Sequence, residues 1–125
     1  MNDFFFKKLD AYQVAKEFTT YIYQVVAEFP TFEQYALSSQ IRRAAISVPS
    51  NIAEGVGRMA IKERLHFIEI AFASIFEVIC QLDTALSANY ITQAQYEKGE
   101  EIATRLTKIL SGLRKSFVEK LANQD

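Results

Sequence analysis

The sequence predicts an all-α protein, an up-and-down four-helix bundle built from a single domain of residues 1–125. Half of its 125 residues are hydrophobic, and the chain holds only four glycines and two prolines. Apolar and polar residues almost never alternate strictly, as they would in half-buried strands. In four segments, apolar residues instead recur every three or four positions, and four such helices with short connections pack most simply as an up-and-down bundle.

The first two helices are bounded by proline and capping signals. Apolar spacing predicts a helix over residues 11–29, and Pro30 ends it. Thr31 and Gln34 have the spacing of a capping box, so we expect the second helix to begin there. Pro49 removes a backbone donor inside this helix, which predicts a kink or a restart over residues 47–51 before Gly55 and Gly57 end the segment.

The third helix, expected over residues 61–88, carries more apolar surface than one bundle core requires. Seven apolar residues step by three and four positions as a heptad seam: Leu65, Ile68, Phe72, Ile75, Ile79, Leu82 and Leu86. A neighbouring apolar stripe is formed by Phe67, Ala71, Val78 and Ala85. We therefore expect part of this helix to contact another subunit.

The fourth helix begins with a second capping box. Asn89 and Tyr90 interrupt the apolar pattern, and Thr92 with Gln95 has the capping-box spacing. The helix that follows carries Tyr96, Leu106, Ile109, Leu113 and Phe117.

Charge and cysteine content restrict the class of protein. Fourteen basic and fifteen acidic residues give a net charge of -1, which argues against a dedicated nucleic-acid-binding domain. No uninterrupted apolar stretch approaches the ~20 residues of a membrane-spanning helix, and the N-terminus lacks the order of a secretory signal. The lone Cys80 lies in an apolar run, so we expect a small buried hydrophobe in a cytoplasmic protein.

A line of polar residues follows one face of the second helix. Arg43, Ser47, Asn51, Glu54 and Arg58 are separated by 4, 4, 3 and 4 positions, and the third helix offers Glu69, Ser74, Glu77 and Gln81. Such lines are commonly solvated surface. The alternative is a hydrogen-bonded network at a helix or subunit contact, where each buried charge requires a partner.

Basic residues are unevenly distributed. The fourth helix carries Arg105, Lys108, Arg114 and Lys115 without an intervening acid, and Arg42, Arg43, Lys62 and Arg64 could join them. Cations near a helix C-terminus complement its dipole. The alternative is a phosphate-contacting patch, which a ring of subunits would repeat.

No catalytic or cofactor motif is convincing. Residues 55–60 match a dinucleotide-binding G-x-G-x-x-A string, but the preceding residues are predicted helix rather than the required strand. Glu63 and His66 have the spacing of a di-iron ligand pair, yet His66 is the chain's single histidine and is expected to be exposed. Neither Ser47 nor Ser50 lies on a strand-to-helix elbow that would support Ser-His-acid catalysis. We expect no enzyme, cofactor, metal or small-molecule substrate.

The spacing of one long motif resembles the signature of the 23S ribosomal RNA intervening-sequence protein family. The motif runs from Phe29-Pro30 through the 41–45 stretch Ile-Arg-Arg-Ala-Ala to the 51–55 stretch Asn-Ile-Ala-Glu-Gly and Arg58. The likeness covers nearly the whole chain, although Ala73 stands where the family commonly has glycine. It implies a four-helix bundle that closes into a homopentameric ring without catalytic residues. The accessory variability determinant protein of diversity-generating retroelements, a pentamer that binds a reverse transcriptase and nucleic acid, is similar to this family.

Together these features predict a non-enzymatic, homo-oligomeric adaptor, pentameric by resemblance, that binds RNA or a ribonucleoprotein through repeated basic patches. The alternative is a protein-only scaffold that holds a partner enzyme without contacting nucleic acid. We expect no membrane partner.

Overall fold

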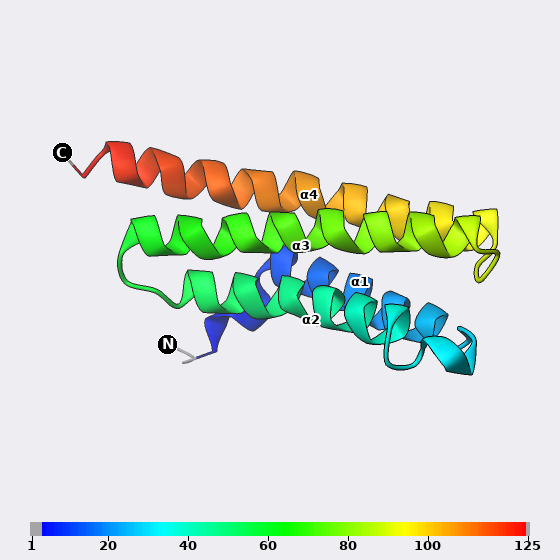
Figure 1. The fold of residues 1–125 in the computed structure, drawn as a ribbon. Coiled ribbons are helices and arrows are strands. Elements are labelled where there is room, and N and C mark those ends of the chain that lie inside the picture. The colour runs from blue at the N-terminus through cyan, green and yellow to red at the C-terminus, as the bar shows by residue number, and fades with distance from the viewer. Residues whose placement is uncertain (1–3, 125) are drawn as a thin grey trace.

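Four antiparallel helices form the bundle that the sequence predicts. A computed structural model describes residues 4–124, and the order is α1 (Asp10–Val26), α2 (Leu37–Val56), α3 (Ile61–Ser87) and α4 (Gln93–Ala122). Two short 3-10 helices, η1 (Phe5–Lys8) and η2 (Thr31–Glu33), precede α1 and α2. Figure 1 shows the α2–α3 connection and both ends of the chain at one end of the bundle, with the other two connections at the opposite end. The prediction of an all-α bundle is confirmed.

The core is a continuous apolar column along the bundle axis. Each helix contributes side chains with less than 2% of their surface exposed: Phe18 and Ile22 from α1, Ile41, Val48 and Ile52 from α2, Ile68, Ile75, Val78 and Leu82 from α3, and Leu106 and Leu110 from α4. Burial of this kind is the main favourable contribution to folding. The helices therefore hold their surface residues on a rigid scaffold.

The connection between α1 and α2 differs from the prediction. Helix α1 ends at Val26, and the capping box expected at Thr31 is wrong, because Thr31 lies inside η2 and its side chain makes no capping bond. The side chain of Glu33 stabilises this connection instead. Its Oε1 accepts from the backbone N–H of Leu37 at 3.4 Å, and its Oε2 accepts from the Tyr90 hydroxyl at 2.8 Å.

Pro49 lies inside α2, which continues from Leu37 to Val56 without a restart. Proline has no N–H for the carbonyl four residues earlier, which belongs to Ala45. The hydroxyl of Thr19 on α1 donates to that carbonyl oxygen at 2.9 Å. A neighbouring helix thus supplies the donor that Pro49 lacks.

Helix α3 ends within one residue of its predicted boundary, but its buried stripe is rotated from the expected one. Ala71, Val78 and Ala85 are fully enclosed by their own protomer, so the expectation that they contact another subunit is wrong. Of the predicted seam, Ile68, Ile75 and Leu82 are buried, whereas the other members, Leu65, Phe72, Ile79 and Leu86, are half-buried. The alanines at 71 and 85 allow a neighbouring helix to pack closely on this face.

Helix α4 begins as predicted. The Gln95 backbone N–H donates to the Thr92 hydroxyl oxygen at 3.1 Å, and the Thr92 N–H donates to Gln95 Oε1 at 2.9 Å, which completes the capping box. Asn89, where the apolar pattern breaks, adopts a positive φ of 63°. Asparagine tolerates this left-handed conformation better than most residues, so it suits the turn between α3 and α4.

Among the described residues, α3 is the one helix whose length and composition would allow it to cross a membrane, with a mean hydropathy of 1.7 in its most apolar stretch. The central helix of a bundle meets the same criterion, so the observation is weak evidence for a membrane. Only 39% of that stretch is buried, so α3 keeps apolar surface outside the core.

Candidate functional site

A cluster of hydroxyl and amide groups joins the middle of α2 to α3. Asn51 Nδ2 donates to the backbone oxygen of Ser47 at 2.7 Å and to Ser47 Oγ at 2.8 Å. Ser74 on α3, with 8% of its surface exposed, donates through its hydroxyl to Ser47 Oγ at 2.9 Å. Hydrogen bonds of this kind remove the penalty of burying polar groups. The cluster fixes the two helices in one register.

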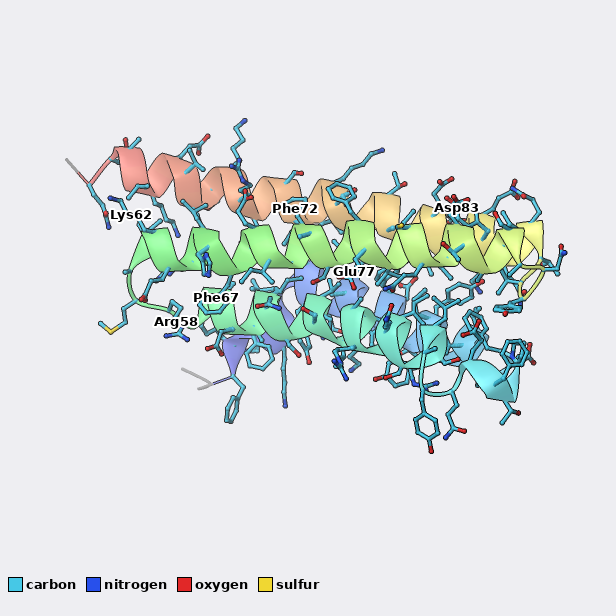
Figure 2. All side chains as sticks on the ribbon, in the orientation of Figure 1. Arg58, Lys62, Phe67, Phe72, Glu77 and Asp83 are labelled. Atoms are coloured by element: carbon cyan, nitrogen blue, oxygen red, sulfur yellow. The ribbon has the colours of Figure 1, made fainter. Side chains whose placement is uncertain are left out.

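Arg58 forms a second polar cluster at the end of α2. Its guanidinium pairs with the carboxylate of Glu54 one turn earlier and lies 4.8 Å from the centre of the Phe67 ring, as Figure 2 illustrates for Arg58 and Phe67. Arg64 Nε donates to the backbone oxygen of Arg58 at 2.6 Å. These groups are partly exposed, so the ion pair contributes little to stability, about 1 kcal/mol at most.

Helices α2 and α3 can approach each other closely here because residue 55 is glycine. A Cβ at Gly55 would lie 3.1 Å from the Cβ of Phe67 and 3.2 Å from the backbone oxygen of Arg64. Gly55 lies within α2 and Gly57 caps its end, so the glycine pair marks a helix end and not a dinucleotide-binding turn. This outcome confirms the interpretation made from the sequence.

Four members of the predicted polar lines belong to neither cluster, and two of them, Arg43 and Glu77, are exposed and face each other's helix. Both side chains line a hollow of about 260 Å³ between α2 and α3. Glu77 Oε2 accepts from Gln81 Nε2 at 3.2 Å. Glu69 lies on the α4 side of α3, where it pairs with Arg114. The line predicted from spacing therefore divides into separate parts.

The predicted basic patch is also divided. Arg105 pairs with Glu17 of α1, and this hydrogen bond raises the pKa of its guanidinium. Arg114 Nε donates to Glu69 Oε1 of α3 at 3.2 Å, and the Arg64 guanidinium lies 5.5 Å from the centre of the Phe117 ring. Because α1 and α3 pack on different sides of α4, these cations do not form one surface.

The other cations of the set are spread along the length of the bundle. Arg42, near the start of α2, lines a mainly polar pocket beside the α1–α2 connection. Lys62, at the start of α3, lies at the opposite end and is exposed, as are Lys108 and Lys115 on α4. Within residues 4–124 these three lysines form no ion pair.

Sequence patterns did not identify the residues that α3 presents to solvent. Phe76 is 65% exposed, and Ala73 and Cys80 are exposed beside it. The expectation that Cys80 is buried is wrong, because it lies on the outer side of α3. The signal available in the sequence was that Phe76 lies outside both apolar stripes.

The sequence offered Glu63 and His66 only as a weak match to a di-iron ligand pair. His66 is exposed as predicted, and its ring contacts that of Phe67, 5.3 Å between centres. Within residues 4–124, no three histidine, cysteine or acidic side chains lie close enough to hold a metal ion.

The arrangement of helices and the motif on α2 agree with a comparison against protein families. The model of the 23S rRNA-intervening sequence protein family matches residues 7–112. The chain belongs to this family.

A solved family structure supports the fold. The 1.70 Å crystal structure of a protein of unknown function from the S23 ribosomal protein family of Bacteroides thetaiotaomicron is 24% identical, with a TM-score of 0.77. The alignment covers 84% of this chain and 95% of that one. No curated protein matches significantly. The comparisons thus establish the family and the fold.

Proposed function

We propose that this protein is a non-enzymatic, homo-oligomeric adaptor of the cytoplasm whose subunits meet through the outer side of α3. The observation that carries the proposal is Phe76, a large apolar side chain that is 65% exposed in the middle of the apolar helix α3. Ala73 and Cys80 lie exposed beside it. A contiguous apolar surface of this kind is typical of protein contacts.

In a ring, each subunit contacts its two neighbours through two different patches. Such head-to-tail contacts form a closed ring when the rotation from one subunit to the next returns to the first subunit. The family resemblance implies five subunits. The outer side of α3 supplies one apolar patch, and further exposed aromatic residues, Phe32 at 77% and Tyr35 at 90%, lie in the connection before α2. We therefore propose a pentamer held by apolar contacts.

The thiol of Cys80 provides a direct test of this contact, because it is the single cysteine and lies on the same surface as Phe76. In the native protein at micromolar concentration, light scattering should give an oligomer, and a thiol-specific reagent should label Cys80 slowly. Phe76→Asp should yield smaller species with rapid labelling, whereas Val118→Asp, also at an exposed apolar position but on α4, should change neither. A native protein that scatters light as a monomer contradicts the proposal.

RNA binding is a second component, supported by Lys62, Lys108 and Lys115, which are exposed and form no ion pair within the described chain. A ring would repeat these lysines in every subunit. Filter binding of RNA across a salt series tests this component, because true phosphate contacts weaken steeply as salt rises. An affinity that is absent or independent of salt would exclude it.

A protein-only scaffold is the competing function. It is favoured by three exposed acids at the start of α4, Glu97, Glu100 and Glu101. It is also favoured because Arg105 and Arg114 each pair with a carboxylate of their own protomer. If a protein partner binds the acids, charge reversal at these three positions should abolish its binding, and nuclease treatment should leave it intact. The opposite pair of results would favour RNA.

A further inference from the structure

A hollow of about 180 Å³ opens between α3 and α4 beside the exposed ring of Phe76. The buried side chains of Ile75 and Ala103 form an apolar floor. Its lining also includes two exposed polar side chains of α4, Glu100 and Thr104. An apolar cavity of about 150 Å³ holds a benzene molecule, so this hollow has the size of one aromatic ring with a polar group at its edge.

Tyr35 has the exposure and the chemistry of a group that would fill this hollow. It lies in the connection between η2 and α2 and is 90% exposed. Within residues 4–124 it makes no hydrogen bond or ring contact, whereas Phe32 nearby packs on the ring of Tyr90. A phenol joins an apolar ring to a hydroxyl that needs a partner when it is buried. Glu100 Oε2 accepts from the Tyr96 hydroxyl at 3.2 Å, which leaves Oε1 as an acceptor for a second donor.

Tyr35 and the hollow lie on different sides of the protomer. The helices surround the core in the order α1, α2, α3 and α4, and Figure 1 shows α4 and the α1–α2 connection on opposite sides of α3. No residue of that connection lines the hollow of its own protomer. The tyrosine of one subunit can therefore enter the hollow of the next, and this contact is head to tail, as a ring requires.

The distribution of charge favours this arrangement over a contact between two α3–α4 sides. Residues 34–53, around Tyr35 and along α2, contain two arginines and no acid. Residues 69–101, which form most of α3 and the start of α4, contain six acids and one lysine. Two copies of the acidic side would repel each other, and that side would also repel a phosphate. The basic start of α2 is instead attracted to it.

We infer that Tyr35 of the partner subunit occupies the hollow, with its ring beside Phe76 and its hydroxyl donating to Glu100. Each subunit then gives a tyrosine to one neighbour and receives one from the other. The inference rests on the homo-oligomer proposed above and specifies the two patches that meet. Tyrosines that fill small pockets are among the few residues that carry most of the binding energy of an interface.

Substitution of Tyr35 tests the contact without disturbing the fold, because its side chain is exposed. Tyr35→Asp should weaken self-association at least about tenfold in sedimentation measured over a dilution series, since it removes the anchor of the contact. Tyr35→Phe keeps the ring and loses the hydroxyl, so it should weaken association less. Tyr23→Asp is the matched control, the same change at an exposed tyrosine of α1, and should associate as the native protein does.

Cross-linking to the native thiol tests which surfaces meet. Cys80 lies one helical turn after Phe76, on the same side of α3, and Gln34→Cys places a second thiol next to an intact Tyr35. A short bis-maleimide should then join each subunit to the next. Denaturing gels should show a ladder of covalent species that extends beyond the dimer. The variant Q34C/C80S should give no ladder, because it lacks the second reactive surface.

The outcomes separate this inference from the broader proposal. Circular dichroism melts establish that each variant remains folded. If the native protein is oligomeric but Tyr35→Asp associates equally well, or Q34C gives no cross-link to Cys80, the tyrosine contact is refuted while the oligomer stands. Cross-linking that stops at the dimer would indicate a two-fold contact and overturn the inference. A monomeric native protein would refute both proposals.

Discussion

Replacing Thr19 with valine should reveal how α2 accommodates a proline in its interior. The Ala45 carbonyl has no backbone donor because residue 49 is proline, and the Thr19 hydroxyl donates to its oxygen at 2.9 Å. The same hydroxyl lies 3.0 Å from the oxygen of Ala15 in its own helix. Ala15 lies in the interior of α1 and has a backbone partner by helix geometry, so Ala45 is the group that needs the hydroxyl.

The expected magnitude follows from burial. Ala45 is 0% exposed and Thr19 is 8% exposed, so water cannot readily replace the lost donor. Valine matches threonine in shape, and leaving a buried carbonyl unpaired costs about 1–3 kcal/mol. Pro49→Ala restores an N–H that can donate to Ala45. The valine substitution should then cost less in the alanine background, with a coupling free energy of about 1 kcal/mol or more.

Urea unfolding followed by circular dichroism measures the four free energies of this cycle. All variants need the same protomer concentration, because self-association would add to the free energy of unfolding. Thr19→Ser is the control that keeps the hydroxyl and loses one methyl group, about 0.8 kcal/mol. Equal losses for Thr19→Val in the proline and alanine backgrounds would refute the proposed role of the hydroxyl.

Two further predictions concern packing and titration. Gly55→Ala should lower the free energy of unfolding by about 1–3 kcal/mol, because its Cβ would lie 3.1 Å from that of Phe67. The matched control Gly112→Ala, with open space around its Cβ, should stabilise α4 by about 0.5–1 kcal/mol, and equal thermal melts would contradict this contrast. The hydrogen bond to Glu33 raises the pKa of the Tyr90 phenol. The folded state therefore holds the phenolic proton more tightly, so this stabilisation is present below pH ~10 and is lost as pH rises through the folded pKa. Glu33→Gln should lower that pKa in an ultraviolet titration, and an unchanged curve would exclude the bond.

The sequence was sufficient for the fold but not for the orientation of α3. Apolar period and capping signals located the helices, and the capping box at Thr92 formed as predicted. The same signal failed at Thr31, because the side chain of Glu33 and a 3-10 turn organise that connection instead. Local spacing cannot distinguish these outcomes, since the deciding partner, Tyr90, is distant in sequence.

For α3 the difficulty was the number of apolar residues. Two stripes met the helical period, one with Leu65 and Phe72 and one with Ala71 and Val78. Periodicity alone does not show which stripe faces the core when both are apolar. Close packing against α2, permitted by Gly55, favours the stripe with small residues. Of the other stripe, Ile68, Ile75 and Leu82 are buried as well, and Leu65, Phe72, Ile79 and Leu86 stay half-buried.

The surplus apolar surface of α3 bears on whether a membrane or another subunit covers it. Glu69, Glu77 and Asp83 are all exposed along this helix, at intervals of eight and six residues. A charged side chain near the centre of a bilayer costs at least about 2.5 kcal/mol, and a membrane leaves such groups few partners. A subunit contact can place cations opposite such carboxylates while it covers the exposed Phe76 of the same helix. The charges that interrupt the apolar surface of α3 therefore favour a protein contact.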